Sequence, residues 1–336
     1  MYKNTKYLKK CLDSLLNQTY KNFELLLRDQ ENDSFEALMY LENNYPELLS
    51  DKRVTIFRGK NLWHSGGHNF LISKMSESSV AYLCASNDML YEKNCIEELV
   101  KNLLENKTFS IAVPKLRVWN FENKTNTEEL NKTNIIDSCG IGLYANHHFF
   151  DIGQGEKDMA QYDNRKEIFG GSGALFLVKK TALEKIKTMN AHSKSNNIFE
   201  YFDELIHYKN DIDLAYRFLW AKQKALFVPL SIAYHDRQVG KKNNKNKSLW
   251  VKESSFFGHL VVLYKNVYKN NFSFSVHLKI IWYLFRSTGF LLLTEPKVLL
   301  QYMKFWKVVY KNKKLYKKKR AMKKQASIAT ITNFFK

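Results

Sequence analysis

The sequence predicts an α/β domain over residues 1–240 and a basic helical segment over residues 241–336. In the first part, short apolar runs alternate with polar turns and with amphipathic stretches of helical spacing, which is typical of an α/β fold. The charge changes at the same boundary, since the second part holds 22 of the 53 lysines and arginines but only two of the 33 acidic residues. The first part is therefore neutral, the second carries the whole net charge of +20, and residues 240–244 are the expected linker.

The N-terminal elements are expected to be a helix and then a strand. Residues 5–17 place apolar side chains at helical spacing, and residues 23–27 form an apolar run of strand length. This run ends at Arg28 and Asp29, in a polar turn that leads into another helix. Strand, acidic turn and helix in this order are the repeating unit of an α/β domain.

A glycine-containing turn is expected after a second strand at residues 54–57. We expect this turn to hold the paired glycines Gly66 and Gly67 and to lead into a helix from Phe70. Paired glycines let a ligand approach the backbone closely, and helix N-termini favour phosphate groups. A tight turn without any ligand explains the same pair, so the glycines alone do not indicate a site.

Another expected strand, at residues 80–85, ends in Ser86, Asn87 and Asp88. Oxygen ligands at the end of a strand suit Mg²⁺ or Mn²⁺. An Asn-Asp pair is also common in ordinary turns, so a purely structural role explains it as well. A further strand is expected at residues 111–114, followed by a glycine-rich loop that runs to residue 174.

The stretch at residues 199–237 combines carboxylates, a helix and a histidine. Its helix is expected to begin at Asp211, because apolar residues recur after it at helical spacing. A short apolar strand at residues 225–228 follows, and His235 closes the unit. A carboxylate at a helix start with a histidine nearby suits proton transfer beside a metal. The alternative is that Asp211 only caps its helix.

The four cysteines show neither a CxxC pair nor the spacing of metal ligands. Cysteines scattered in this way are expected to be reduced thiols, which are typical of a cytoplasmic protein.

The apolar residues of the C-terminal segment, interleaved with lysines, predict amphipathic helices. A basic run follows at residues 311–324. The apolar stretch at residues 272–293 is interrupted by Lys279 and Arg286, so it falls short of the roughly 20 uninterrupted apolar residues of a membrane-spanning helix. Helices of this kind lie in the membrane interface, and polybasic runs bind anionic lipid. The alternative is a helical subdomain that packs on the α/β domain.

Residues 199–237 resemble the catalytic domain of inverting glycosyltransferases of family 2, within the rhamnosyltransferase-like group. The matching residues are Phe202-Asp203-Glu204, Tyr208, Asp211, Asp213-Leu214-Ala215, Arg217, Ala225, Val228-Pro229 and His235. Upstream, the family's "N.G..GG.N" pattern is matched by Asn61, Gly66, Gly67 and Asn69, and its "GQGE…QYD…FG.SGA" order by residues 153–174. One position departs from the pattern, since Asn210 stands where the family has a glutamate.

The resemblance implies a GT-A fold and a role for each matching residue. It makes Asp211 the general base and Asp88 with His235 the ligands of Mg²⁺ or Mn²⁺. The donor-binding residues that it implies are Asp29, Asn61, Gly66, Gly67, Asn69, Asn87 and Asp88. The residues that it places against the sugar and the acceptor are Gly171, Ser172, Gly173, Asp203 and Asn210.

The activity implied is metal-assisted transfer of a sugar, with inversion and in a single displacement, from a nucleotide-diphosphate donor to a hydroxyl. The subgroup suggests rhamnose as the sugar, and a cell-surface polysaccharide or a lipid-linked molecule as the acceptor. The enzyme would lie in the cytoplasm, on the inner face of the membrane. Family members begin with an inner strand of the "VSVIIPVYN" type that is missing before Thr5, so we expect either a start upstream or a truncated chain.

Two other functions are compatible with parts of the sequence. The missing strand, Ser86 and Asn210 would fit an inactive relative that only binds a nucleotide-sugar or partner proteins. The total charge of +20 would fit a nucleic-acid-binding protein. That function is disfavoured, because the C-terminal aromatic residues lie on an apolar helix face and are not interleaved along a groove. We therefore expect no nucleic-acid partner.

Overall fold

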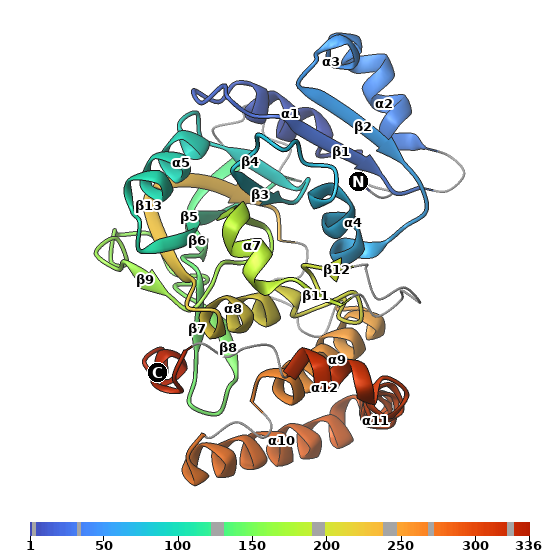
Figure 1. Cartoon of the computed structure of the whole chain (residues 1–336), viewed down its shortest axis with the longest axis vertical. Coiled ribbons are helices and arrows are strands. Elements are labelled where there is room, and N and C mark those ends of the chain that lie inside the picture. Colours follow the sequence, from blue (N-terminus) through green and yellow to red (C-terminus); the bar gives the residue numbers. More distant parts are fainter. Residues whose placement is uncertain are drawn as a thin grey trace.

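The computed structural model describes residues 1, 5–31, 35–121, 131–189, 199–237, 247–267, 272–320 and 326–336. It shows an α/β domain with the C-terminal helices packed beneath it (Figure 1). The expected linker at residues 240–244 lies outside the described residues. The strands are β1 (Leu25–Asp29), β2 (Val54–Arg58), β3 (Ala81–Ala85), β4 (Met89–Tyr91), β5 (Phe109–Trp119), β6 (Lys132–Ser138), β7 (Ile141–Leu143), β8 (Phe149–Asp151), β9 (Glu167–Ile168), β10 (Leu175–Lys179), β11 (Thr188–Met189), β12 (Phe199–Glu200) and β13 (Lys224–His235). The helices are α1 (Leu8–Leu16), α2 (Glu36–Asn44), α3 (Pro46–Ser50), α4 (Trp63–Ile72), α5 (Cys95–Glu105), α7 (Lys180–Ile186), α8 (Asn210–Trp220), α9 (Leu249–Asn266), α10 (Phe274–Thr294), α11 (Leu300–Lys311), α12 (Lys313–Arg320) and α13 (Ala329–Thr332), with a 3₁₀ turn at Pro296–Leu299.

The main sheet has seven strands. Its order is β3-β10-β5-β13-β4, with β6 also paired to β5 and β9 also paired to β13. The two longest strands, β5 and β13, are parallel, and the other pairs of this sheet are antiparallel. Since β13 continues past a bulge between Val228 and Ile232, it reaches His235 and is longer than the predicted strand at residues 225–228.

Strands β1 and β2 form a separate parallel pair, covered by α1, α2 and α3 (Figure 1). Among the described residues no strand joins this pair to the main sheet. The backbone of Met1 lies at the end of β1. Its amino group donates to the carbonyl of Arg28 at 2.6 Å, and its carbonyl accepts from the amide of Gln30 at 2.9 Å.

The expected glycine turn before a helix at Phe70 was wrong, because α4 already begins at Trp63. Gly66 and Gly67 lie inside this helix and are buried. A Cβ on Gly66 would come within 2.9 Å of the Leu62 Cβ, and one on Gly67 within 3.1 Å of the Gln30 side chain. Close packing therefore explains these glycines, and it outweighs their low helix propensity.

The C-terminal helices share one hydrophobic core with the α/β domain. The core cluster around Tyr216 of α8 includes Val261 of α9, Val309 of α11 and Tyr316 of α12. The net charge of the chain changes near residue 240, but the hydrophobic core continues across this boundary. The packing matches the alternative of a helical subdomain on the α/β domain.

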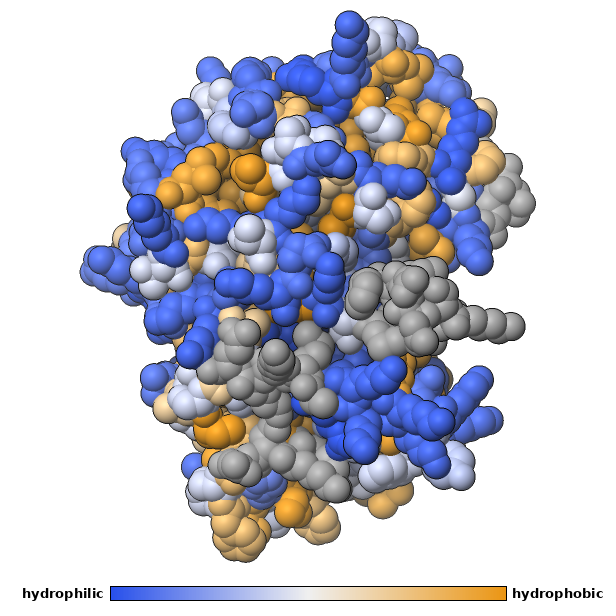
Figure 2. Space-filling model, in the orientation of Figure 1, coloured by the Kyte–Doolittle hydropathy of each residue, from blue (hydrophilic) through white to orange (hydrophobic). Residues whose placement is uncertain are grey.

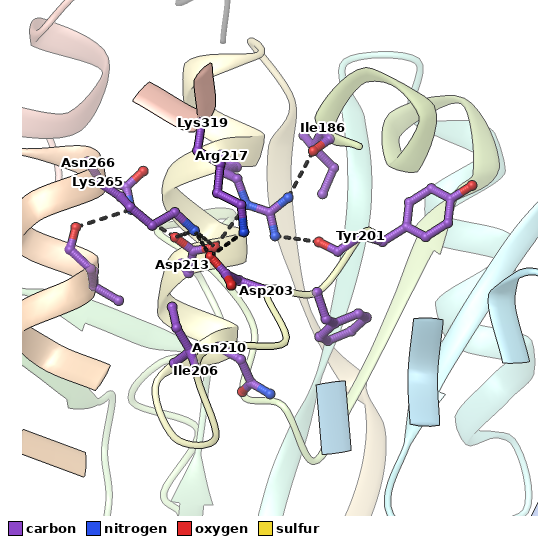
Figure 3. Close-up of polar contacts among 12 residues, drawn as sticks. Ile186, Tyr201, Asp203, Ile206, Asn210, Asp213, Arg217, Lys265, Asn266 and Lys319 are labelled. Atoms are coloured by element: carbon purple, nitrogen blue, oxygen red, sulfur yellow. Dashed lines mark hydrogen bonds and ion pairs between the residues drawn. The ribbon is translucent and has the colours of Figure 1, made fainter. Parts of the chain in front are cut away.

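A buried cluster of charged residues fixes this packing (Figure 3). The Lys265 ammonium of α9 lies 2.6 Å from the carboxylate of Asp203 and 2.8 Å from that of Asp213. From α12, Lys319 pairs with the same Asp203 at 3.0 Å and with Glu200. These groups are almost completely buried. Hence Lys319 is not part of the exposed basic run, while residues 321–324 of that run lie outside the described residues.

Both aspartates of the cluster are ionised. Burial alone would raise the pKa of Asp203, but Lys265 and Lys319 outweigh it and hold this pKa below the usual range. Burial likewise opposes ionisation of Asp213, and Lys265 with Arg217 lowers its pKa. Arg217 donates from Nε to the Asp213 carboxylate at 2.9 Å, and the Asn266 amide donates to it at 3.0 Å. A buried cluster with both signs of charge is stable only while every member is present.

We predict that Lys265→Met destabilises the protein by about 3–5 kcal/mol, because it leaves two buried carboxylates without their shared cation. Urea unfolding followed by circular dichroism measures the change. The control is Lys307→Met on α11, where the lysine is exposed, and it should change the stability by less than about 0.5 kcal/mol. Equal stability of the two variants would show that the cluster does not hold the C-terminal helices in place.

Candidate active site

A large open cavity of about 2180 Å³ lies between the α/β domain and the C-terminal helices. Its wall combines residues at the ends of β4 and α8 with residues of α9, α10 and the C-terminal Asn333–Lys336 stretch. Three of the residues singled out in the sequence line it: Asp88, Asp211 and His235. The cavity is therefore the place where the predicted base and the predicted metal ligands meet.

Sheet register brings Asp88 and His235 together. Strands β4 and β13 pair with His235 opposite Met89, so Asp88, one residue earlier, lies beside the histidine. The Asp88 carboxylate is 3.5 Å from His235 Nε2, and Ser86 donates to the same carboxylate at 2.5 Å. Asn87 adjoins this pair and is partly buried.

Two further charged residues support this pair from behind. The Asp137 carboxylate is 2.9 Å from His235 Nδ1 and 3.1 Å from Arg237 Nε. Arg237 also donates to Asp151 of β8 at 2.7 Å. Asp137 is buried within β6, which pairs with β5 beside β13. The result is a series of contacts between residues of alternating charge, which begins at Asp88 and ends at Asp151.

Asp88 and His235 both favour their charged forms. Burial opposes ionisation of Asp88, but hydrogen bonds from His235 and Ser86 outweigh it and lower its pKa. Burial also lowers the pKa of His235, yet the carboxylates of Asp137 and Asp88 prevail and raise it to about 9. The protonated imidazole therefore directs Nε2–H towards the Asp88 carboxylate, and a bound cation would take the place of this proton.

The pair fits a divalent metal ion. Asp88 offers a carboxylate oxygen, and Asp137 fixes the imidazole so that Nε2 faces that oxygen. A histidine whose second nitrogen is bonded to a carboxylate is the usual arrangement of a metal ligand. Asp88 and His235 would thus hold Mg²⁺ or Mn²⁺, with Asp137 orienting the ring.

Asp211 lies in the first turn of α8, with its carboxylate at the cavity wall. One carboxylate oxygen accepts from the amide of Gly173 at 3.1 Å, and the other accepts from the amide of Ile212 at 2.9 Å. The side chain therefore makes a local bond of the capping kind and still reaches the cavity. Capping and proton transfer are compatible here.

A cluster of His64, His68 and Cys84 lies behind Asp211, with ligand atoms within 4.8 Å of one another. Asn210 donates to His64 Nδ1 at 2.9 Å, so a neutral His64 carries its proton on Nε2 and offers no lone pair there. His68 Nδ1 is bonded to the Tyr82 hydroxyl at 2.6 Å. Burial lowers the pKa of both histidines. We therefore interpret the cluster as a hydrogen-bonded support for the start of α8.

The predicted donor residues of the N-terminal part do not line the cavity. Both carboxylate oxygens of Asp29 accept backbone amides, from Glu31 and Leu38, and thereby hold the start of α2. Asn61 accepts from the amide of Trp63 at 2.7 Å, at the start of α4. These side chains, like Gly66 and Gly67, shape the backbone.

Asn69 holds the segment that leads to α8. Its amide group donates to the Phe202 carbonyl at 2.9 Å and to Glu204 at 3.0 Å. Its oxygen accepts from the amides of Tyr201 and Phe202. The hydrogen-bonding capacity of this amide is thus used inside the protein.

Among the five residues expected at the sugar and the acceptor, Gly173 contacts Asp211 directly. Ser172 is buried, and a Cβ on Gly171 would come within 2.8 Å of Val113. Asp203 belongs to the buried charged cluster, and Asn210 bonds His64 and Ser65 of α4. The structure does not bring Asp203 or Asn210 to the cavity.

Four residues of the site, Asp137, Asp151, Lys209 and Arg237, were not singled out in the sequence. Asp137 could have been suspected, since a carboxylate in a strand of the core needs a partner. Arg237 lies two residues after His235. The position of Lys209 carries no comparable signal, although its backbone is left-handed (φ 72°) at the start of α8.

Comparisons with known proteins concern the family and the fold of the chain. A family model described as "Glycosyl transferase family 2" matches residues 1–186. The glycosyltransferase GlyA of Streptococcus pneumoniae is 26% identical over 216 residues, which cover 56% of this chain and 30% of that protein. The chain thus spans less than a third of that relative's length.

A solved structure, that of GalNAc-T7 with UDP, GalNAc and Mn²⁺, superposes with a TM-score of 0.55 and 15% identity. The match covers 77% of this chain and 45% of the other. At this identity the likeness concerns the fold, and it confirms the predicted GT-A type of α/β domain.

We predict that the chain binds Mn²⁺ through Asp88 and that Asp137→Asn weakens this binding about 10- to 100-fold, as expected for a residue that orients a metal-bound histidine. Electron paramagnetic resonance of free Mn²⁺ in a titration measures the affinity. Asp88→Ala should weaken it at least as much. Glu167→Gln removes a cavity carboxylate that is paired with Lys224, and it should have no effect. Unchanged affinity in both aspartate variants would exclude this pair as the metal site.

Proposed function

Because the chain belongs to glycosyl transferase family 2, we propose that it transfers a sugar from a nucleotide-diphosphate donor to an acceptor hydroxyl. The observation that carries this proposal is the single cavity shared by the Asp211 carboxylate and the Asp88–His235 pair. Transfer to a hydroxyl needs a base for the attacking oxygen and positive charge for the departing diphosphate. The cavity supplies groups for both.

In this proposal Asp211 is the general base. The acceptor oxygen forms the new bond to the anomeric carbon as its proton passes to the Asp211 carboxylate. In the same step the bond from that carbon to the diphosphate oxygen breaks, and the nucleoside diphosphate leaves with the electron pair. Attack from the side opposite the leaving group inverts the configuration. The Gly173 amide, bonded to the carboxylate, keeps it in place.

Asp88 and His235 would hold Mg²⁺ or Mn²⁺, which stabilises negative charge on the diphosphate when bound. Asp137 and Arg237 keep the imidazole oriented towards Asp88. The presence of UDP and Mn²⁺ together in GalNAc-T7 supports a metal of this kind.

The N-terminal donor residues would act by shaping the donor side of the site. Asp29 and Asn61 fix the starts of α2 and α4 through backbone hydrogen bonds. Asn69 fixes residues 201–204, directly ahead of α8. The match of residues 153–174 to the rhamnosyltransferase-like pattern supports rhamnose as the transferred sugar.

The acceptor would be lipid-linked, because α10 gives the cavity an apolar wall. Trp282, Tyr283, Phe290 and Leu291 line the cavity from this helix, opposite the polar floor around Asp211. A polar glycan head would reach the floor, and an apolar chain would lie along the helix. A polysaccharide without a lipid would leave this wall exposed to water.

The outer surface of the C-terminal helices supports a peripheral position on the inner face of the membrane. In Figure 2 hydrophobic surface appears along the lower edge, where Figure 1 places α10. The exposed apolar side chains of α10 and α11 are Phe274, Leu278, Ile281, Trp282, Phe285, Phe290, Leu292, Leu293, Leu300, Met303, Trp306 and Tyr310. Apolar side chains with lysines at their border are typical of helices in the membrane interface. Within the described residues α10 is also the one helix that meets the length and composition of a membrane span.

We predict that Asp211→Asn lowers the rate of sugar transfer by at least about 100-fold, the lower end of general-base contributions, and leaves binding of nucleoside diphosphate unchanged. Release of nucleoside diphosphate from a panel of nucleotide-sugars, with Mn²⁺ present, measures turnover. Glu167→Gln is the control and should retain full activity. Near-normal turnover of Asp211→Asn would show that another group is the base, and a wild-type chain that binds donors without turning them over would be an inactive relative.

We also predict that the full chain sediments with anionic lipid vesicles and that Trp282→Ala with Phe285→Ala releases it at about 1 M NaCl, where the Debye length is only about 3 Å. The wild type should stay partly bound at that salt concentration, because burial of apolar surface is not screened. Leu104→Ala on α5 removes an exposed apolar residue elsewhere and should behave as the wild type. A wild-type chain that remains in the supernatant at low salt would contradict the membrane position.

A further inference from the structure

The cavity holds a second charged group, on the side that α9 and α10 form. Its members are Lys209, Lys247 and Arg286, all of which line the cavity. Lys209 directly precedes α8 and lies two residues before Asp211. Lys247 lies just before α9, and Arg286 lies on α10. Three separate parts of the chain thus bring positive charge to the cavity, and Lys209 does so two residues from the proposed base.

In the described part of the chain, the basic residues of the cavity differ in whether a carboxylate pairs with them. Within the described residues, neither Lys209 nor Lys247 nor Arg286 forms an ion pair with a carboxylate. Three other basic residues of the wall have such partners, namely Lys224 with Glu167, Lys252 with Glu295, and Arg237 with Asp137 and Asp151. Arg165 and Lys336, which also line the cavity, have no ion pair with a carboxylate among the described residues either, but the group of Lys209, Lys247 and Arg286 includes the residue beside the start of α8.

The surroundings of the group confirm the excess of positive charge. Lys209 Nζ lies 5.4 Å from the centre of the Phe149 ring. Burial lowers the pKa of Lys247, and the charges of Lys209, Arg237 and Lys252 lower it further. Burial and Lys209 also lower the pKa of His148. Cations held close together in this way are stabilised by an anion between them.

We propose that Lys209, Lys247 and Arg286 bind a phosphate group of the acceptor. This inference rests on the proposed function. A metal at Asp88 and His235 would neutralise the diphosphate of the donor. The donor diphosphate therefore does not need the positive charge of Lys209, Lys247 and Arg286. Lys209 adjoins Asp211, the base for the acceptor hydroxyl, and Arg286 extends from the apolar helix α10. The acceptor that fits has a phosphate between its sugar-receiving hydroxyl and an apolar chain.

Octyl phosphate, which combines a phosphate with an apolar chain, is a suitable probe for the full-length chain. Isothermal titration calorimetry should show binding to the wild type, and Lys209→Gln and Lys247→Gln should each weaken it by about tenfold or more, because hydrogen bonds between charged groups are roughly twice as strong as neutral ones. Lys224→Gln, which removes a cavity lysine paired with Glu167, should bind as the wild type. Equal weakening by Lys224→Gln, or no binding by the wild type, would overturn the proposal.

A second titration separates the acceptor phosphate from the diphosphate of the donor. It is made with Mn²⁺ and a saturating nucleoside diphosphate, chosen from UDP, GDP and dTDP by its binding to the wild type. Octyl phosphate should still bind, and Lys247→Gln should leave nucleoside diphosphate binding within about twofold of the wild type. Displacement of octyl phosphate together with weaker nucleotide binding in Lys247→Gln would assign the group to the donor and overturn the proposal. None of these measurements depends on turnover, so their failure is distinguishable from a failure of the proposed function.

Discussion

The ammonium group of Lys265 is the contact on which the arrangement of the cavity depends. It joins the Asp203 carboxylate, from the segment before α8, to the Asp213 carboxylate on α8 itself. Asp213 lies two residues after Asp211, so the contact that neutralises one aspartate also fixes the rotation of the helix that presents the other. Figure 3 shows Lys265 beside Asp203 and Asp213. Since Lys265 belongs to α9, a residue of the basic C-terminal segment positions the proposed base.

The same cluster explains why the C-terminal helices cannot be regarded as an accessory. Asp203 and Asp213 bring two negative charges into the interior beside Glu200, whose pKa burial and Asp203 raise to about 7, and Arg217 supplies one positive charge from the α/β domain. The two remaining positive charges come from Lys265 and Lys319, which both follow residue 240. Buried carboxylates without partners are strongly destabilising. The net charges of the two parts therefore do not show that lysines of the C-terminal helices pair with buried carboxylates of the α/β domain. Each part supplies charged groups that stabilise the other.

The sequence predicted the α/β class and five of the thirteen strands of the described residues, and the reasons are local. Apolar runs define strands such as β3 and β13, and the spacing after Asp211 defines α8 to within one residue. The meeting of Asp88 with His235 could not follow from spacing, because it depends on the register of β4 against β13. It was anticipated only through the resemblance to a family. Pairing across the sheet also explains why Asp137 was missed.

The errors arose where tertiary contacts outweigh local preference. Gly66 and Gly67 indicated a turn, but close packing against Leu62 and Gln30 keeps them in a helix. Asp203 lies in a motif shared with catalytic domains, and only the structure shows that its partners are lysines more than 60 residues away. A charge count along the chain cannot distinguish a lysine in solvent from one in the interior.

Helix α10 is at once a wall of the cavity and the most apolar exposed surface of the described chain. In the proposed membrane position, a helix with this double role would make the bilayer a part of the reaction space. An acceptor anchored in that bilayer would reach the cavity by lateral diffusion, and its mole fraction among the lipids would govern its encounter with the site. Dilution with inert lipid would then slow the reaction at constant total acceptor, as in surface-dilution kinetics, whereas the donor would still follow its concentration in bulk solution.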